Sequence, residues 1–244
     1  MNKISKVAVA TATLIAATSA SAVSIDFRQE YRNEQDQYNS RFKMAGSVDN
    51  HYFGLEIKQT GKPFSEIEWA DNEFEYGYKF KVTKKFTVTP SMPITFGEKK
   101  TTYKPQVRVQ YKFNNLITTK LRYRHEFGVC AESVEEKCFT YRDGTTKADN
   151  ANRSKLTANI SGKWNSFFYD VEANYAEDFF NSDYKMGTNG EYDWDYNFKL
   201  GYNFKEWNLS PYMELGNIGC SSSSCGDDQG GRQLRSRVGI KYSF

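Results

Sequence analysis

The chain has 244 residues, a formal net charge of +3 and a mean hydropathy of −0.74. No run after residue 22 approaches the roughly 18 consecutive apolar residues that a membrane-spanning helix needs, which excludes a helical membrane protein. Aromatic residues nevertheless make up 16% of the chain, and they recur at alternate positions. This combination is typical of a β-barrel with lipid-facing aromatic girdles and a polar interior.

The N-terminus has the layout of a secretory signal. Lys3 and Lys6 precede an apolar run from Val7 to about Ala17, and Ala20-Ser21-Ala22 provides the small residues of a cleavage site. The run is too short and too rich in alanine to serve as a permanent transmembrane helix. We therefore expect residues 1–22 to be a signal peptide and residues 23–244 to form a single barrel domain.

Apolar and polar residues alternate in about twelve segments of the exported part. The clearest segment runs from Glu73 to Phe80, where four aromatic residues alternate with charged residues and glycine. Period-2 alternation predicts strands with one apolar and one polar face. Pro90 and Pro93 are awkward in the fifth segment, because proline cannot donate a hydrogen bond to a ladder. In chain order the predicted strands are 24–31, 40–46, 52–58, 73–80, 86–96, 103–113, 119–127, 155–161, 169–175, 194–202, 209–215 and 233–244.

The last predicted strand ends the chain on an aromatic residue. Val238, Ile240, Tyr242 and Phe244 share one face. An apolar face on an edge strand would promote aggregation in a soluble protein, so it needs a permanent apolar partner. A terminal Phe244 preceded by Tyr242 resembles the last strand of Gram-negative outer-membrane barrels. That resemblance implies outer-membrane lipid and the barrel-assembly machinery as partners.

The connections between the predicted strands alternate in length. Short links lie near 49–50, 84–85, 114–115, 165–166 and 205–206, and longer ones near 32–39, 59–72, 128–152, 176–191 and 217–232; only the link near 97–101 departs from the pattern. Bacterial barrels have short periplasmic turns and longer external loops, and an even number of strands places both termini in the periplasm. The predicted fold class is all-β: a transmembrane antiparallel barrel of about twelve strands in the outer membrane, with periplasmic termini.

Four cysteines fall in two of the long loops, Cys130 and Cys138 in one and Cys220 and Cys225 in the other. An exported protein enters an oxidising compartment, which favours a local pair in each loop among three possible connectivities. Zinc is the alternative, but neither pair has the usual ligand spacing and neither loop contains a histidine. We expect disulfides and no metal or other cofactor.

Basic residues gather on the face opposite the aromatics, which would line the lumen. One group lies between Lys104 and Arg124, and closure of the barrel would bring the last strand beside the first two to form another. Rows of Arg and Lys favour anions, although any one of them could instead serve a structural ion pair. Inward acids fall mostly on other strands, which predicts basic walls and acidic walls. The pore-lining candidates are Arg28, Arg41, Lys43, Arg108, Arg122, Arg124, Arg235, Arg237 and Lys241.

Four stretches, 23–28, 121–124, 211–217 and 235–244, resemble the oligogalacturonate-specific porin family. The resemblance implies a narrow, monomeric barrel that takes up acidic oligosaccharides passively, with inward arginines forming tracks along the pore wall. The arginines in the matching stretches are Arg28, Arg122, Arg124, Arg235 and Arg237. The cysteine loops and the serine run 221–224 depart from the family pattern, which leaves gating and solute choice open. The expected function is a porin for acidic oligosaccharides, with oligogalacturonates as the solute.

Other functions remain open at this point. The channel could be a general small-anion pore or a sialic-acid pore, and an adhesin or structural barrel would bind through its external loops. A membrane enzyme would need a histidine base beside a nucleophile. His51 falls at a predicted turn and His125 on the lipid-facing side of its strand, so we expect no enzyme. The sequence carries no nucleic-acid motif, and we expect no nucleic-acid partner.

Overall fold

The computed structural model describes residues 22–63, 66–131, 137–140, 147–177, 191–220 and 231–244. No helix in these ranges is long and apolar enough to cross a membrane. A 3-10 helix, η1 (Lys205–Trp207), joins two of the strands. The strands are β1 (Ala22–Arg32), β2 (Gln37–Val48), β3 (His51–Thr60), β4 (Glu68–Tyr78), β5 (Phe80–Lys81), β6 (Phe86–Gly97), β7 (Lys100–Tyr103), β8 (Gln106–Lys112), β9 (Thr118–Cys130), β10 (Phe139–Thr140), β11 (Lys147–Ala148), β12 (Asn150–Trp164), β13 (Phe167–Glu177), β14 (Tyr192–Tyr202), β15 (Leu209–Gly219) and β16 (Arg232–Ser243).

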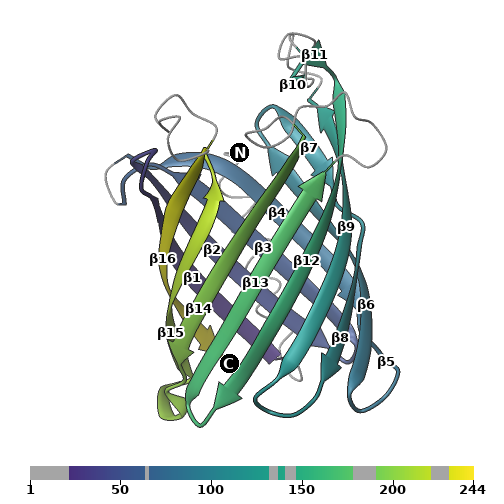
Figure 1. The fold of residues 1–244 in the computed structure, drawn as a ribbon, viewed down its shortest axis with the longest axis vertical. Coiled ribbons are helices and arrows are strands. Elements are labelled where there is room, and N and C mark those ends of the chain that lie inside the picture. Colours follow the sequence, from purple (N-terminus) through teal and green to yellow (C-terminus); the bar gives the residue numbers. More distant parts are fainter. Residues whose placement is uncertain (1–21, 64–65, 132–136, 141–146, 178–190, 221–230) are drawn as a thin grey trace, which may run out of the picture.

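The sheet closes on itself to form a barrel (Figure 1). Consecutive strands pair antiparallel around the wall, β12 pairs with β9, and β16 closes the ring against β1. With β4 and β5 taken as one strand, and β7 and β8 as another, the wall has twelve strands. The predicted all-β antiparallel barrel of about twelve strands is confirmed, and so is the pairing of the last strand with the first.

Two of the predicted strands are interrupted, and this corrects their prediction as single elements. The segment 103–113 divides at Pro105, which has no N–H to donate. The pairing with β9 nevertheless keeps one register across the break, because Tyr103 lies opposite Phe127 and Gln106 opposite Arg124. β4 and β5 separate at Lys79, whose backbone N–H donates to the carbonyl oxygen of Asn50 at 2.8 Å. The wall is therefore continuous despite both interruptions.

The turns at one end of the barrel are tight, as predicted from their Asn and Asp residues. Asp49 and Asn165 adopt left-handed backbone conformations, with φ of 53° in each case. Asn114 Oδ1 accepts hydrogen bonds from the backbone N–H groups of Leu116 and Ile117, both at 2.8 Å. We call this the short-turn end, which is the lower end in Figure 1.

At the opposite end, the prediction of a long connection over residues 32–39 is wrong. β1 continues to Arg32 and β2 begins at Gln37, so the link is a tight turn over 33–36. Asp36 adopts the left-handed region there, with a φ of 44°. Tyr31 lies opposite Tyr38 in register, and their ring centroids are 4.8 Å apart. This segment is hydrophilic, so its composition predicted a loop. The two strands nevertheless stay paired beyond the apolar part of the wall.

Large apolar side chains cover the outside of the barrel. Phe74 and Tyr76 are about 40% exposed, while Val238 and Phe244 reach 61% and 67%. Near the short-turn end, Tyr202 and Phe204 form part of a chain of aromatic contacts that also includes Phe167 and Trp207. An outer apolar band bordered by aromatic residues is the surface that lipid requires.

A disulfide joins Cys130 at the end of β9 to Cys138, as predicted. The adjacent hairpin β10–β11 projects beyond the barrel (Figure 1). Phe139 of this hairpin packs against Gly128 of β9, where a Cβ would lie 2.6 Å from the ring. Cys220 is disulfide-bonded as well, whereas Cys225 lies outside the described residues, so the pairing of these two stays a prediction.

Candidate functional site: two arginine clusters in the lumen

The first cluster combines Arg235 and Arg237 of β16 with Arg28 of β1 and Arg41 of β2. Arg28 lies opposite Arg41 on one side and opposite Gly239 on the other. All four side chains alternate with lipid-facing residues, so they project into the lumen. We call these four residues the β1 cluster. The barrel closure creates it, because β16 and β1 are at the two ends of the chain.

Most of the β1 cluster is neutralised by carboxylates. Arg237 donates to Glu30 at 2.6 Å and also hydrogen-bonds Glu214. Arg41 lies 2.5 Å from an oxygen of Asp26 and 3.5 Å from one of Glu56. These carboxylates are largely buried, so the pairs connect neighbouring strands in a setting of low solvent access.

Arg235 is held by Asn197 and lies 3.9 Å from Glu30. Arg28 differs from its three neighbours. Within the described part of the chain its guanidinium has no ion pair or hydrogen bond, and its Nε, like those of Arg41 and Arg235, is buried without a partner. It lines a cavity of about 380 Å³ together with Arg41 and Arg237. Like charges on both sides and no carboxylate of its own leave this guanidinium available to an anion.

The second cluster lies on β8 and β9 and consists of Arg108, Arg122 and Arg124; we call it the β9 cluster. Arg108 lies opposite Arg122 in register. Arg124 donates to Gln106 at 2.7 Å and lies 3.6 Å from Glu126. Arg122 donates to the hydroxyl of Thr157 at 2.9 Å, and its Nε is buried without a partner. Neither Arg108 nor Arg122 forms an ion pair with any described residue.

The two clusters face each other across the lumen. In the closed order of the twelve strands, β1 and β9 are six strands apart in either direction. Diametrically opposite strands of a barrel present their inward side chains toward a shared axis. The two clusters therefore lie on opposite walls of the lumen, where Arg28 and Arg122 line separate cavities.

The prediction of separate basic and acidic walls is wrong for the two clusters. Asp26 and Glu30 share β1 with Arg28, and Glu126 shares β9 with Arg122 and Arg124. The period-2 alternation that identified the inward arginines also places these acids inward, so the signal was present in the sequence. The acids sit beside the bases because charges in a lumen must be paired or hydrated.

A ladder of amides and acids that sequence reasoning missed occupies β12, β13 and β14. Asn159 donates to Asp170 at 3.0 Å and to Glu172 at 3.1 Å. Asn174 donates to Glu172 and Asp195, each at 2.9 Å. This part of the wall is acidic, and its carboxylates accept hydrogen bonds from the neutral amide groups of the asparagines. The residues are separated in sequence, so only strand register reveals the ladder.

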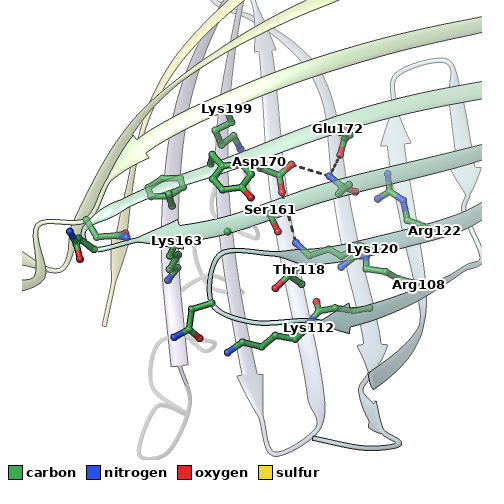
Figure 2. A pocket seen from close by; sticks show the side chains of 18 of the residues that line it. Arg108, Lys112, Thr118, Lys120, Arg122, Ser161, Lys163, Asp170, Glu172 and Lys199 are labelled. Atoms are coloured by element: carbon green, nitrogen blue, oxygen red, sulfur yellow. Dashed lines mark hydrogen bonds and ion pairs between the residues drawn. The ribbon is translucent and has the colours of Figure 1, made fainter. Parts of the chain in front are cut away.

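The remaining candidates lie toward the short-turn end. Lys43 of β2 lies 3.4 Å from Glu56. Lys241 of β16 lies opposite Asp26 in register and is exposed. A cavity of about 1190 Å³ is lined by Lys43, Arg108 and Arg122, together with further lysines (Figure 2). The lumen thus continues from the two clusters toward this end of the barrel.

The model of one protein family, described as oligogalacturonate-specific porin protein (KdgM), matches residues 16–244. The chain belongs to the KdgM family. It is therefore an integral outer-membrane barrel of Gram-negative bacteria and a channel, and the expectation that it is no enzyme is confirmed.

Relatives in the KdgM family match along most of their length. The oligogalacturonate-specific porin KdgM of Dickeya dadantii is 30% identical, over 99% of this chain and 100% of its own. The uncharacterized protein YiiY of Salmonella typhimurium is 29% identical, over 93% of this chain and 92% of its own. The N-acetylneuraminic acid outer membrane channel protein NanC of Escherichia coli is 20% identical, over 79% of each chain.

Solved structures of KdgM-family porins share the fold. A NanC porin structure superposes with a TM-score of 0.73 at 17% identity and covers 89% of this chain and 98% of its own. A KdgM porin structure gives a TM-score of 0.63 at 23% identity and covers 91% of this chain and 99% of its own. The barrel architecture is thus the family architecture.

Proposed function

We propose that this KdgM-family porin admits acidic oligosaccharides by passive diffusion, with oligogalacturonates as its solute. The observation that carries the proposal is the distribution of partners in the two clusters. Arg28 on one wall, and Arg108 and Arg122 on the other, have no carboxylate partner within the described ranges. Arg41 and Arg237 are occupied by acids and hold the wall together.

Oligogalacturonates match this arrangement chemically. Every sugar unit carries a carboxylate, and the planar guanidinium fork binds carboxylates through two parallel hydrogen bonds. Unpaired guanidiniums on opposite walls allow one carboxylate to pass from one wall to the other as the chain advances. Several weak contacts permit both entry and release, which conduction requires.

The names of the relatives support an acidic sugar as the solute. KdgM of Dickeya dadantii is oligogalacturonate-specific by name, and a KdgM porin has been solved in complex with disordered oligogalacturonate. NanC is named for N-acetylneuraminic acid, which also carries a carboxylate. The 30% identity to KdgM, against 20% to NanC, favours the uronate oligomer.

The orientation in the membrane belongs to the same proposal. Bacterial barrels keep short turns in the periplasm and longer loops outside. The turns at Asp49 and Asn165 would then face the periplasm, and the hairpin β10–β11 would lie outside. Solute entering from outside would meet the cavity around Arg28 before it reached the lysines near the short turns.

Block of single channels in a planar bilayer tests the proposal. Trigalacturonate should block the ion current at concentrations at which neutral maltotriose does not. In the Arg28→Gln and Arg122→Gln variants the blocking concentration should rise about tenfold, which corresponds to about 1.4 kcal/mol. Lys62→Gln, an exposed substitution in the link between β3 and β4, serves as the control. Equal block by maltotriose would contradict the proposal.

A further inference from the structure

The cavity at the short-turn end begins at Arg108 and Arg122 of the β9 cluster, but lysines make up most of its basic lining. Lysines from four elements meet there: Lys112 of β8, Lys120 of β9, Lys163 of β12 and Lys199 of β14 (Figure 2). Lys205 of η1 also lines it. We call this region, a cavity of about 1190 Å³, the lysine vestibule.

The lysine vestibule has an excess of positive charge. Eight basic and two acidic residues line it. The side-chain ammonium groups of Lys112, Lys163 and Lys205 form no ion pair or hydrogen bond with any described residue, and Lys120 Nζ is 3.9 Å from the carboxylate of Asp170. The two acids, Asp170 and Glu172, already accept hydrogen bonds from Asn159. Lys199 is 3.3 Å from Glu214, so it is the charge of Lys112, Lys163 and Lys205 that no ion pair neutralises.

The aromatic ring of Phe168 lies among these lysines, and Tyr169 also lines the cavity. Phe168 projects inward from β13, opposite Gly201 of β14. A Cβ on Gly201 would lie 2.2 Å from Phe168 Cζ, so the ring occupies the space that a side chain would fill. The ring packs on the strand backbone and lines the cavity. An inward phenylalanine is unusual in a lumen whose other inward residues are mostly polar.

We propose that the lysine vestibule is a second binding site, which holds one carboxylated sugar unit of the passing oligosaccharide. The C–H face of the sugar ring would pack on Phe168, and its carboxylate would lie among Lys112, Lys120 and Lys163. Pockets that combine an apolar surface with a few polar groups bind and orient small ligands. This inference rests on the proposed function, because it assumes that acidic oligosaccharides enter the lumen.

Arginine and lysine side chains suit different stages in the passage of the oligosaccharide. Arginine offers a fixed fork, whereas lysine is a compact, strongly hydrated charge on a flexible stem. Lysine therefore holds a carboxylate less rigidly and releases it more easily. A trimer that reaches both the arginine clusters and the vestibule gains from linked contacts, whereas a monomer occupies one region at a time. The vestibule should consequently contribute more to binding as the oligomer lengthens.

The test compares single-channel block by galacturonate and trigalacturonate in matched variants. Phe168→Ala and the double variant Lys112→Gln/Lys163→Gln should each raise the concentration of trigalacturonate needed for block about fivefold. Phe168→Trp should retain block, because it keeps an aromatic face. Lys84→Gln, an exposed substitution in the turn after β5, should leave block unchanged. Heat-modifiable migration on gels confirms that each variant forms the barrel.

The two proposals fail in different ways. Wild-type block by trigalacturonate, with unchanged block in both the Phe168→Ala and lysine variants, would overturn the vestibule site and leave the proposed function standing. Absence of block in the wild type would overturn both. A change in the lysine variant alone would show that charge acts without the aromatic surface, and would overturn the sugar site. Loss of block in Phe168→Ala, with block retained in Phe168→Trp, supports it.

Discussion

Arg28 and Arg41 lie opposite each other on β1 and β2, yet only Arg41 has a carboxylate partner, with its Nη2 2.5 Å from Asp26 Oδ1. Tyr212 also donates to Asp26, at 3.0 Å, so that carboxylate is already engaged from two other strands. Arg28 is therefore positioned beside an acid that is bound to other groups. Two adjacent residues of one type thus have different roles, one in stability and one available to solute.

Exchange of these two arginines for glutamine should separate the roles. Arg41→Gln should lower the free energy of unfolding by about 1 to 3 kcal/mol, because it leaves Asp26 without its cationic partner, whereas Glu56 keeps Lys43 and Lys58. Arg28→Gln should leave stability within about 0.5 kcal/mol of wild type, since it removes no ion pair. Urea unfolding of the refolded barrel measures both. Equal destabilisation by the two substitutions would contradict the assignment.

Charge reversal in the β9 cluster should change ion selectivity. Arg108→Glu/Arg122→Glu alters the charge of the lumen by −4 where no described carboxylate neutralises it, so preference for anions should fall or invert. The reversal potential in a salt gradient measures this. As a control, reversal of the exposed charge on Lys84, in the turn between β5 and β6, should leave the potential unchanged. An unaltered potential in the double variant would count against conduction along these arginines.

Barrel closure should depend on Gly239. An added Cβ would lie 2.4 Å from Tyr212 Cζ and 2.9 Å from the backbone oxygen of Phe27, so β15 and β1 would both be displaced. Gly239→Ala should therefore reduce the fraction of chains that reach the heat-modifiable barrel. Gly54→Ala is the matched control, because its nearest neighbour, Glu75 Cβ, is 3.7 Å away. Equal assembly of the two variants would refute the steric explanation.

The Cys130–Cys138 disulfide should stabilise the end of β9 without setting the conductance. It closes a short loop, and such a crosslink constrains the unfolded chain by about 2 to 3 kcal/mol in the entropic description. Reduction should make the segment between the two cysteines easier to cleave by protease while the barrel persists. Nonreducing peptide mapping identifies the pair, and four free thiols by mass measurement would contradict it.

The sequence by itself determined the class of fold and the inward side of each strand. Alternation of residues such as Phe74 and Glu75 depends only on the period of a β-strand, and a barrel turns that period into a lipid face and a lumen face. The same rule selected Arg28 and Arg122 as inward residues. Resemblance in short stretches was enough to indicate the family, which the family match over 16–244 confirms.

Only the tertiary structure decided which inward charged side chains have ion-pair partners. Arg28 and Arg41 look alike in the sequence. The stagger between strands, however, places Asp26 and Glu56 within reach of Arg41 but not of Arg28. Strand register likewise places Phe168 over Gly201, 33 positions further along the chain, and so creates an aromatic surface among lysines. Alternation along one strand predicts which way a side chain points. The neighbour that it meets depends on the offset between strands, which is fixed when the barrel closes.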